Sequence, residues 1–301
     1  MKLLVRSYSP HVNNIFHFYF DRLYEIYRHL LHCEALDQVA LLVSREKGRF
    51  DSLYKIFAPK RISYQYTAHR ILQRVGIQTD AIQVVDRRFH TPDAGVVGAT
   101  EHLPDFRQFF ISGMELEIPK HIEPRITLIK RRRVRSLVNH DQVVRGLARL
   151  RIPVEEHYLE DLPLVEQMRL MLRTSLLVAP HGAGNTNMLF MRSGTALIEI
   201  NPYGWKPVLY REIGKALGIH YSSVSGLRDP TLYTRPATER IRSLEARHGE
   251  VTFETAEQEL RTQSEVRYWV RDQNILVDRD QLVQLAEQEI NAVVKSLPEG
   301  L

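Results

Sequence analysis

The sequence predicts an α/β protein built from two facing, doubly wound (Rossmann-like) domains. Three observations support this prediction. Short apolar runs alternate with amphipathic stretches in both halves, prolines gather between the halves, and a glycine-rich turn follows an apolar run in the second half. Such alternation is typical of parallel sheets covered by helices on both faces. With 301 residues, the chain is long enough for two domains of ordinary size.

The composition is that of a globular protein with a hydrophobic core, since 44% of the residues are hydrophobic and 26% are charged. No apolar run reaches the roughly 18 residues of a transmembrane helix, and the apolar segment at residues 1–6 is too short for a signal peptide. The only cysteine, Cys33, allows no disulfide framework. We therefore expect a cytoplasmic protein; the alternative is a luminal domain that lacks its membrane anchor.

The first domain is expected over residues 1–120. Its predicted elements are an amphipathic helix over 14–31, buried strands over 39–43 and 81–85, and a helix over 70–76 that Gly76 ends. In the first helix, Phe16, Phe20 and Leu23 share a face with other apolar residues, whereas His17 and Asp21 lie on the polar face.

Prolines mark the join between the two predicted domains. Pro104, Pro119 and Pro124 all lie within residues 100–124, and the last two are close together. Because proline interrupts regular helices and strands, this segment is predicted to be a hinge or linker.

The second domain is expected over residues 121–280, followed by a C-terminal helix at 281–301. The predicted elements are strands over 125–129, 175–179 and 195–200, helices over 139–150, 165–173 and 208–217, and a last apolar run over 274–278. Asn139 is the expected N-cap of the first of these helices, and Gly218 ends the third. Residues 228–263 are charged and show no clear period, which indicates a loop insertion or an exposed helical arm.

The glycine-rich turn is the most informative functional signal. It comprises His181, Gly182, Ala183, Gly184, Asn185, Thr186 and Asn187, and a helix-compatible stretch over 187–191 follows it. A turn from a strand into a helix directs backbone N–H groups at an anion, and glycine lets the backbone approach the ligand closely. The turn therefore predicts a phosphate or diphosphate site, the alternative being an ordinary tight turn.

The same segment resembles glycosyltransferase family 61. The residues that carry the resemblance are His-Gly-Ala-Gly-x-Thr-Asn at 181–187, then Phe190, Gly194 and the strand 197–200. The family includes O-mannose and EGF-domain N-acetylglucosaminyltransferases and xylosyltransferases. Its members usually have an apolar residue where this chain has Asn185. The resemblance implies the B-type glycosyltransferase architecture and inverting transfer of xylose or N-acetylglucosamine from a UDP-sugar to a glycan or glycoprotein.

The catalytic base is expected in the first domain. Family 61 members carry an Asn-x-x-His-Phe-x-x-Asp pattern that this chain matches at Asn14, His17, Phe18 and Asp21. Because His17 and Asp21 are four residues apart on a helix, they can touch. A histidine suits proton removal from an acceptor hydroxyl near neutral pH. Asp21 itself, or Asp93 in a turn further along, is the alternative base.

Arginines are expected to bind the donor diphosphate. Residues 130–135 are Lys-Arg-Arg-Arg-Val-Arg and follow the strand 125–129, at the end where open α/β sheets bind ligands. Arg131, Arg135 and Asn139 repeat every four residues, as in the family. Arginine binds phosphate oxygens bidentately and can offset the charge of the leaving group. Arg132 and Arg133 are expected to be solvated neighbours.

Glu199 ends the strand after the glycine turn, so we expect it to accept hydrogen bonds from ribose hydroxyls. His181 either donates to a phosphate oxygen or fills the turn. No divalent metal is expected, because arginines can supply the positive charge and the 13 histidines show no His-Glu-x-x-His spacing.

A second function class uses the same basic cluster. The formal net charge of +5 is concentrated in residues 130–135, which is also compatible with a nucleic-acid-binding protein. A basic nucleic-acid reader needs aromatic residues between its cations, and the aromatic residues of this chain lie mostly elsewhere. We therefore expect a nucleotide sugar and a glycan or glycoprotein as partners, and no nucleic acid.

Overall fold

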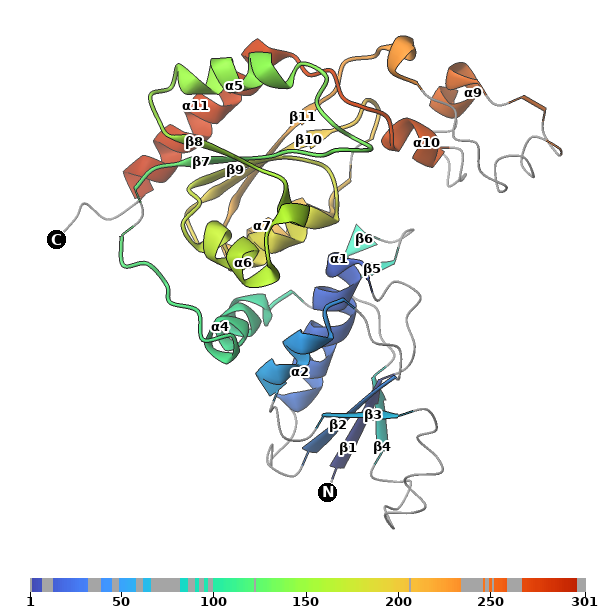
Figure 1. Ribbon diagram of the computed structural model, residues 1–301, viewed down its shortest axis with the longest axis vertical. Helices are drawn as coiled ribbons and strands as arrows, with labels where there is room; N and C mark the ends of the chain where they lie inside the picture. The colour runs from blue at the N-terminus through green and yellow to red at the C-terminus, as the bar shows by residue number, and fades with distance from the viewer. Residues whose placement is uncertain are drawn as a thin grey trace. The chain divides into compact units, whose positions relative to one another are not determined.

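The computed structural model describes residues 2–6, 13–31, 39–44, 49–57, 62–65, 82–85, 90–91, 95–96, 100–121, 123–205, 207–233, 246, 249–250, 252–258 and 267–296. The chain forms two compact units, Met1–Ile118 and Pro119–Leu301. Each unit has its own parallel sheet, which confirms the predicted α/β class (Figure 1). No helix among the described residues is long and apolar enough to span a bilayer.

The first unit contains a four-stranded parallel sheet of order β3-β2-β1-β4. Its strands are β1 (Lys2–Arg6), β2 (Val39–Ser44), β3 (Ile62–Gln65) and β4 (Ile82–Val85), and a short antiparallel pair joins β5 (His90–Thr91) to β6 (Gly95–Val96). Its helices are α1 (Ile15–Phe18), a π-helical segment η1 (Tyr19–Tyr24), α2 (Glu25–Leu30), a 3-10 helix η3 (Asp51–Phe57) and α4 (Leu103–Gly113). The predicted strands at 39–43 and 81–85 are confirmed, while the helix predicted at 70–76 lies outside the described residues.

Part of the predicted linker is a regular helix. α4 occupies residues 103–113, so the prediction of a linker over 100–124 was wrong there. The physical reason is the position of Pro104 in the first turn of α4, where a missing N–H costs no helical hydrogen bond. Aromatic contacts with the α1–α2 region bury one face of α4; for example, the rings of Tyr19 and Phe110 are 5.2 Å apart.

The helix predicted over 14–31 exists, but it is irregular, and much of its polar side is buried by other parts of the unit. The chain widens into π-helix between α1 and α2. Asp21, Arg22 and Glu25 are all buried. Arg22 Nη1 donates to the Tyr54 hydroxyl at 3.0 Å, and Arg28 donates to Glu25 at 3.1 Å. Periodicity identified the apolar face correctly and could not show that protein also covers the other face.

The second unit contains a five-stranded parallel sheet of order β8-β7-β9-β10-β11. Its strands are β7 (Ile126–Ile129), β8 (Val154–His157), β9 (Leu176–Pro180), β10 (Ala196–Asn201) and β11 (His220–Ser225). Its helices are α5 (His140–Ala148), η5 (Leu159–Asp161), α6 (Leu164–Leu172), η6 (Ala183–Phe190), α7 (Leu209–Leu217), η7 (Pro230–Leu232), α9 (Phe253–Gln258), α10 (Arg267–Arg271) and α11 (Arg279–Ser296).

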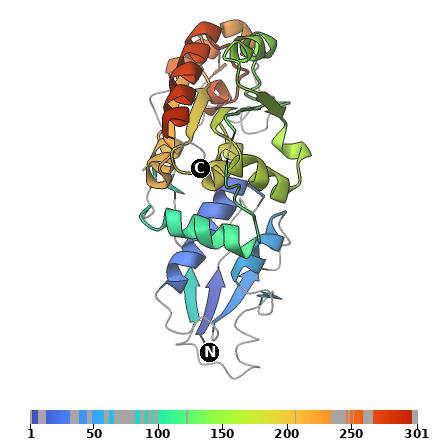
Figure 2. The same ribbon diagram turned by 90° about the vertical axis from the view of Figure 1, so that its left-hand side faces the viewer.

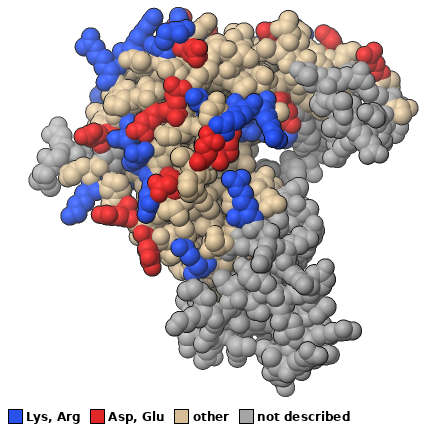
Figure 3. Space-filling view, in the orientation of Figure 1, with Lys and Arg blue, Asp and Glu red and all other residues tan. Residues whose placement is uncertain are grey.

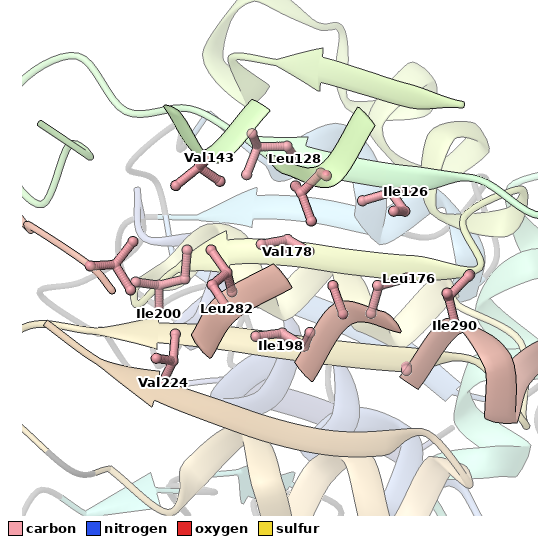
Figure 4. Packing of buried hydrophobic residues seen from close by; sticks show 14 of the residues in the cluster. Ile126, Leu128, Val143, Leu176, Val178, Ile198, Ile200, Val224, Leu282 and Ile290 are labelled. Atoms are coloured by element: carbon pink, nitrogen blue, oxygen red, sulfur yellow. The ribbon is translucent and has the colours of Figure 1, made fainter. Parts of the chain in front are cut away.

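Helices cover both faces of this second sheet. Figures 1 and 2 show α5 and α11 side by side on one face, and Figure 1 shows α6 and α7 on the other. Side chains of β7, β9, β10 and β11 meet Leu282 and Ile290 of α11 and Val143 of α5 in an apolar cluster (Figure 4). The C-terminal helix is therefore part of the core of this unit. At about 25 cal/mol per Å² of buried apolar surface, this cluster is a main source of its stability.

The strands and helices predicted for the second unit are present, whereas β8 and β11 were not predicted. Gly218 ends α7 with a left-handed backbone (φ 68°), as predicted. Asn139 occupies the N-cap position of α5, but its side chain does not cap that helix. In the loop region predicted at 228–263, the structure describes the short helices η7 and α9.

Candidate anion-binding site

The strand order of the second sheet creates one position suited to a ligand. Numbered from β7, the order is 2-1-3-4-5, so the connections leave β7 and β9 toward opposite sides of the sheet. In open α/β sheets, ligands bind at such a switch point, outside the carboxyl ends of the two strands. β7 ends at Ile129, just before the arginine cluster, and β9 ends at Pro180, just before His181. The topology thus brings the two predicted anion-binding segments together.

Arg131 and Arg135 both contact the glycine-rich turn. Arg135 Nη1 donates to the His181 carbonyl at 3.1 Å, and Arg131 Nε donates to the Val134 carbonyl at 3.0 Å. The Arg131 guanidinium lies against the Cα of Gly182, so closely that a Cβ there would collide with Nη1. A side chain at position 182 would therefore have to displace the Arg131 guanidinium, although the extended backbone itself does not demand glycine.

The two arginines form a partly buried pair of like charges. Burial lowers the pKa of Arg131, and burial together with the charge of Arg131 lowers the pKa of Arg135 to about 10. Both guanidiniums therefore remain charged at neutral pH. The Arg135 side chain is only 14% exposed, and its backbone has a positive φ of 61°. Buried cations are costly unless an anion compensates them, so this pair is suited to binding an anion.

Glu199 is the buried centre of a hydrogen-bond network and not an open ligand for ribose. It is fully buried. Its Oε1 lies 2.8 Å from His181 Nδ1 and accepts from Asn185 Nδ2 at 3.2 Å, while its Oε2 accepts from the Tyr221 hydroxyl at 2.7 Å. Protein groups thus occupy both oxygens, which corrects the expected contact with ribose. Glu199 instead fixes the ring of His181 and directs its other nitrogen, Nε2, away from the carboxylate.

The remaining side chains of the turn point into the protein and hold the loop in place. The helix after the turn begins at Ala183, earlier than the predicted stretch 187–191, and is a 3-10 helix. Asn185, Thr186 and Asn187 are buried, and Asn187 Nδ2 donates to Gln167 at 2.9 Å. The Tyr210 hydroxyl donates to the Gly182 carbonyl at 2.7 Å, and Leu159 lies against Gly184. Backbone N–H groups at the start of η6 are therefore the parts of the turn that can meet an anion.

Asn139 does not join the two arginines. Its Nδ2 donates to the Val277 carbonyl at 2.8 Å, and its Oδ1 accepts from the Val277 N–H at 3.3 Å. Because this pairing uses both ends of the amide, Asn139 ties residues 274–278 to the start of α5. Asn139 therefore has a structural role here, although its four-residue spacing from Arg135 had suggested a place in the anion site.

Sequence reasoning missed several residues around the turn. The Trp205 ring lies 6.0 Å and the Tyr210 ring 6.1 Å from the His181 ring, measured between centroids. Asp272 Oδ1 lies 3.7 Å from Arg135 Nε. Trp205 follows the carboxyl end of β10, so the rule that located the arginines could have found it as well. Asp272 is remote in sequence, and no sequence signal marks it.

Two other members of the basic cluster, Lys130 and Arg132, pair with acidic side chains. Arg132 makes a bidentate pair with Asp161, and its guanidinium lies 3.9 Å above the centroid of the Tyr158 ring. Lys130 lies 3.4 Å from Glu156. In Figure 3, positive and negative side chains are interspersed over the visible described surface. This pattern agrees with the expected solvated neighbours and does not favour a nucleic-acid surface.

In the first unit, the structure places the two expected catalytic residues in contact. His17 Nδ1 lies 2.7 Å from Asp21 Oδ2, and the His17 side chain is 25% exposed whereas that of Asp21 is 3% exposed. The Asn14 side chain accepts from the Phe16 N–H at 3.0 Å and caps α1. The contact spans the junction with the π-helix, a feature often found at functional sites. Asp93 lies outside the described residues.

Among the residues that the structure describes, no group of three or more His, Cys, Asp or Glu side chains is placed to hold a metal ion. Residues 278–280 have the sequence Asp-Arg-Asp, a pattern seen in metal sites. Here Asp278 Oδ1 accepts from the N–H groups of Asp280 and Gln281 at 2.9 and 3.0 Å. This aspartate therefore caps the start of α11.

Known proteins resemble this chain over most of its length. Residues 1–198 match the family model described as Glycosyltransferase 61. A protein O-linked-mannose β-1,4-N-acetylglucosaminyltransferase 2 from Xenopus laevis is 25% identical over 69% of this chain and 38% of its own length. An EGF domain-specific O-linked N-acetylglucosamine transferase from Drosophila melanogaster is 28% identical over 38% of this chain and 23% of its own length.

A xylan glycosyltransferase from Arabidopsis thaliana is 30% identical over 37% of this chain and 24% of its own length. The chain thus spans less than two fifths of each of these three relatives. Among solved structures, a glycosyl transferase family 9 protein from Veillonella parvula aligns over 98% of both chains, with 10% identity and a TM-score of 0.38.

Proposed function

This chain belongs to the glycosyltransferase 61 family, and from that premise we propose that it transfers a sugar from a UDP-sugar to a hydroxyl group of a glycan or glycoprotein. The observation that carries the proposal is the pair Arg131 and Arg135, partly buried against the backbone of the His181–Gly182 turn at the switch point of the second sheet. Partly buried cations beside a glycine turn are suited to bind a diphosphate. Every UDP-sugar contains such a diphosphate between its nucleoside and its sugar.

In the proposed reaction, the acceptor oxygen attacks the anomeric carbon while the bond from that carbon to the diphosphate oxygen breaks. Negative charge then develops on the leaving diphosphate. Arg131 and Arg135 stabilise this charge by donating hydrogen bonds to the phosphate oxygens, and they do so more strongly in the transition state than in the ground state. The two arginines thereby supply the positive charge that a divalent ion supplies in other transferases, so we propose a metal-independent reaction.

His17 is the proposed general base. As the new bond forms, the acceptor hydroxyl loses its proton to His17 Nε2, because Nδ1 faces Asp21 at 2.7 Å. The Asp21 carboxylate fixes the ring orientation and compensates the imidazolium that results. A single displacement of this kind inverts the configuration at the anomeric carbon. A carboxylate base, Asp21 or Asp93, is the alternative within the same proposal.

The donor sugar is proposed to be N-acetylglucosamine or xylose. The names of the three relatives include two N-acetylglucosamine transferases and one xylan transferase, and they favour neither sugar. The identity of the nucleotide can be tested without knowledge of the acceptor.

The test is a thermal-shift panel of UDP-, GDP-, CMP- and dTDP-sugars with the full chain. A ligand at 100 times its Kd should stabilise the protein by about 2.7 kcal/mol. We expect UDP-N-acetylglucosamine or UDP-xylose to raise the unfolding temperature most. Stabilisation by a sugar nucleotide of another base, with no effect of any UDP-sugar, would refute the proposed donor.

A further inference from the structure

A third arginine lies beside the glycine-rich turn, although it is remote from the turn in sequence. Arg271 is the last residue of α10, and its guanidinium carbon lies 5.6 Å from the centre of the Trp205 ring. Its Nε and Nη2 each donate to a carboxylate oxygen of Asp272 at 2.8 Å. The indole and the carboxylate thus fix the plane of the guanidinium from two directions.

Both partners of Arg271 also contact the site described above. Trp205 lies beside His181, with 6.0 Å between the ring centroids. Asp272 Oδ1 lies 3.7 Å from Nε of Arg135, which in turn donates through Nη1 to the His181 carbonyl. These contacts form a closed ring of neighbours around the turn. Arg271 is therefore held at the site by Trp205, which lies beside His181, and by Asp272, which also faces Arg135.

Three guanidiniums lie around this ring, together with the carboxylates of Asp272, Glu160 and Glu199. Arg131, Arg135 and Arg271 lie close enough for the charge of Arg271 to lower the pKa of the other two arginines, in addition to the larger effect of burial. Asp272 is the carboxylate that acts on both of them, and Glu160 also acts on Arg131. Because the charges of Arg131 and Arg271 lower the pKa of Arg135, the guanidiniums repel one another, and a diphosphate placed among them offsets this repulsion.

We propose that Arg271 is a third cationic ligand of the donor diphosphate, fixed in place by Trp205 and Asp272. This inference rests on the proposed function, because it assigns a further residue to the same donor site. The chemistry recognised is a pair of linked phosphate groups. Arg131 and Arg135 lie against the turn, and Arg271 adds the guanidinium N–H groups that Asp272 does not occupy.

Binding of inorganic pyrophosphate and of UDP to the full chain, measured by isothermal titration calorimetry, tests the role of Arg271. The variants are Arg271→Gln, Arg271→Lys and, as the matched control, Arg169→Gln. Arg169 lies on α6 of the same unit, is 57% exposed, and pairs with Glu166 at 2.6 Å as Arg271 pairs with Asp272. We expect Arg271→Gln to weaken both ligands at least tenfold and Arg271→Lys to recover part of the loss, because lysine keeps the charge but not the fork.

Arg169→Gln should bind both probes as the wild type does. Unfolding temperatures of all variants show whether a loss of binding reflects a loss of folding, and recovery by lysine separates a charge effect from a packing effect. If the wild type binds UDP and Arg271→Gln binds it equally well, the inference is overturned and the proposed function stands. If the wild type binds neither pyrophosphate nor UDP, the proposed donor site itself is overturned.

Discussion

At the scale of single residues, Gly182 has the most exacting surroundings in the site. Its backbone is extended (φ 160°), which any residue can adopt, so alanine would be excluded only by the Arg131 guanidinium. We predict that Gly182→Ala displaces that side chain and weakens UDP binding about tenfold, the effect of losing one charged hydrogen bond, with little change in unfolding temperature. Calorimetry of UDP binding measures the first effect.

A double-mutant cycle shows whether the alanine acts through Arg131. If it does, adding Gly182→Ala to Arg131→Ala should cost little further affinity, because the displaced group is already gone. Fully additive losses would mean that the methyl group blocks the ligand directly, which would contradict this account of Gly182.

Glu199 illustrates which residue roles the sequence could not reveal. Its position at the end of a strand after a phosphate turn suggested contact with ribose. That position was correct, but the carboxylate is turned inward, where His181, Asn185 and Tyr221 bind it. The direction of a side chain at a strand end depends on partners from other elements, and Tyr221 lies on the neighbouring strand β11. A single sequence contains no record of that pairing.

At the scale of elements, the glycine turn and the arginine segment were predictable because each follows a short apolar run. Parallel strands bring their carboxyl ends to one edge, so sequence order alone placed Arg131 and Arg135 near Gly182. The α10 segment with Arg271 was not predictable. It lies between the charged region 228–263 and the apolar run 274–278, where the sequence predicted no element. Its contact with Trp205, and the contact of the adjacent Asp272 with Arg135, place it at the site.

The junction of α1 with the π-helix carries the proposed base. We predict that His17→Ala leaves UDP affinity within about twofold of wild type and lowers kcat by at least roughly a hundredfold, since the group acts mainly in the transition state. Steady-state kinetics combined with calorimetry separates the two effects. The matched control is His102→Ala, because His102 belongs to the same unit and also lies beside a carboxylate, 3.7 Å from Glu101. This control should keep wild-type turnover.

Asp21→Asn distinguishes the two kinds of base. If His17 is the base, the asparagine keeps a hydrogen-bond partner for the ring and part of the activity survives. If His17→Ala retains most of its turnover while Asp21→Asn or Asp93→Asn abolishes it, the base is a carboxylate and His17 has a structural role.

At the scale of the whole molecule, the fold class follows from simple patterns. Apolar runs in both halves indicated the two parallel sheets, and the prolines pointed to the region where the units meet in sequence, at Ile118 and Pro119. The C-terminal helix was expected to follow the second domain as a separate segment. In the structure, Leu282, Ala286 and Ile290 complete the core of that unit, because the apolar face of α11 covers the sheet beside α5.

The proposed chemistry makes the intact enzyme independent of divalent metal. We predict that sugar transfer in excess EDTA continues at close to its rate without chelator, because Arg131 and Arg135 compensate the leaving group. The rate of UDP release from the UDP-sugar in the presence of acceptor measures this. An enzyme that stops in EDTA and recovers only with Mn²⁺ or Mg²⁺ would show that the arginines do not suffice.

The two partly buried arginines beside the glycine turn are proposed to hold the donor diphosphate. The most direct measurement is the affinity for UDP, in EDTA, of the wild type, Arg131→Ala and Arg135→Ala, with Arg169→Gln as the control. Loss of a charged hydrogen bond to phosphate costs about 1.5–3 kcal/mol, or roughly ten- to a hundredfold in Kd. We predict this loss for each arginine variant and none for the control. Wild-type affinity in both arginine variants would contradict the account.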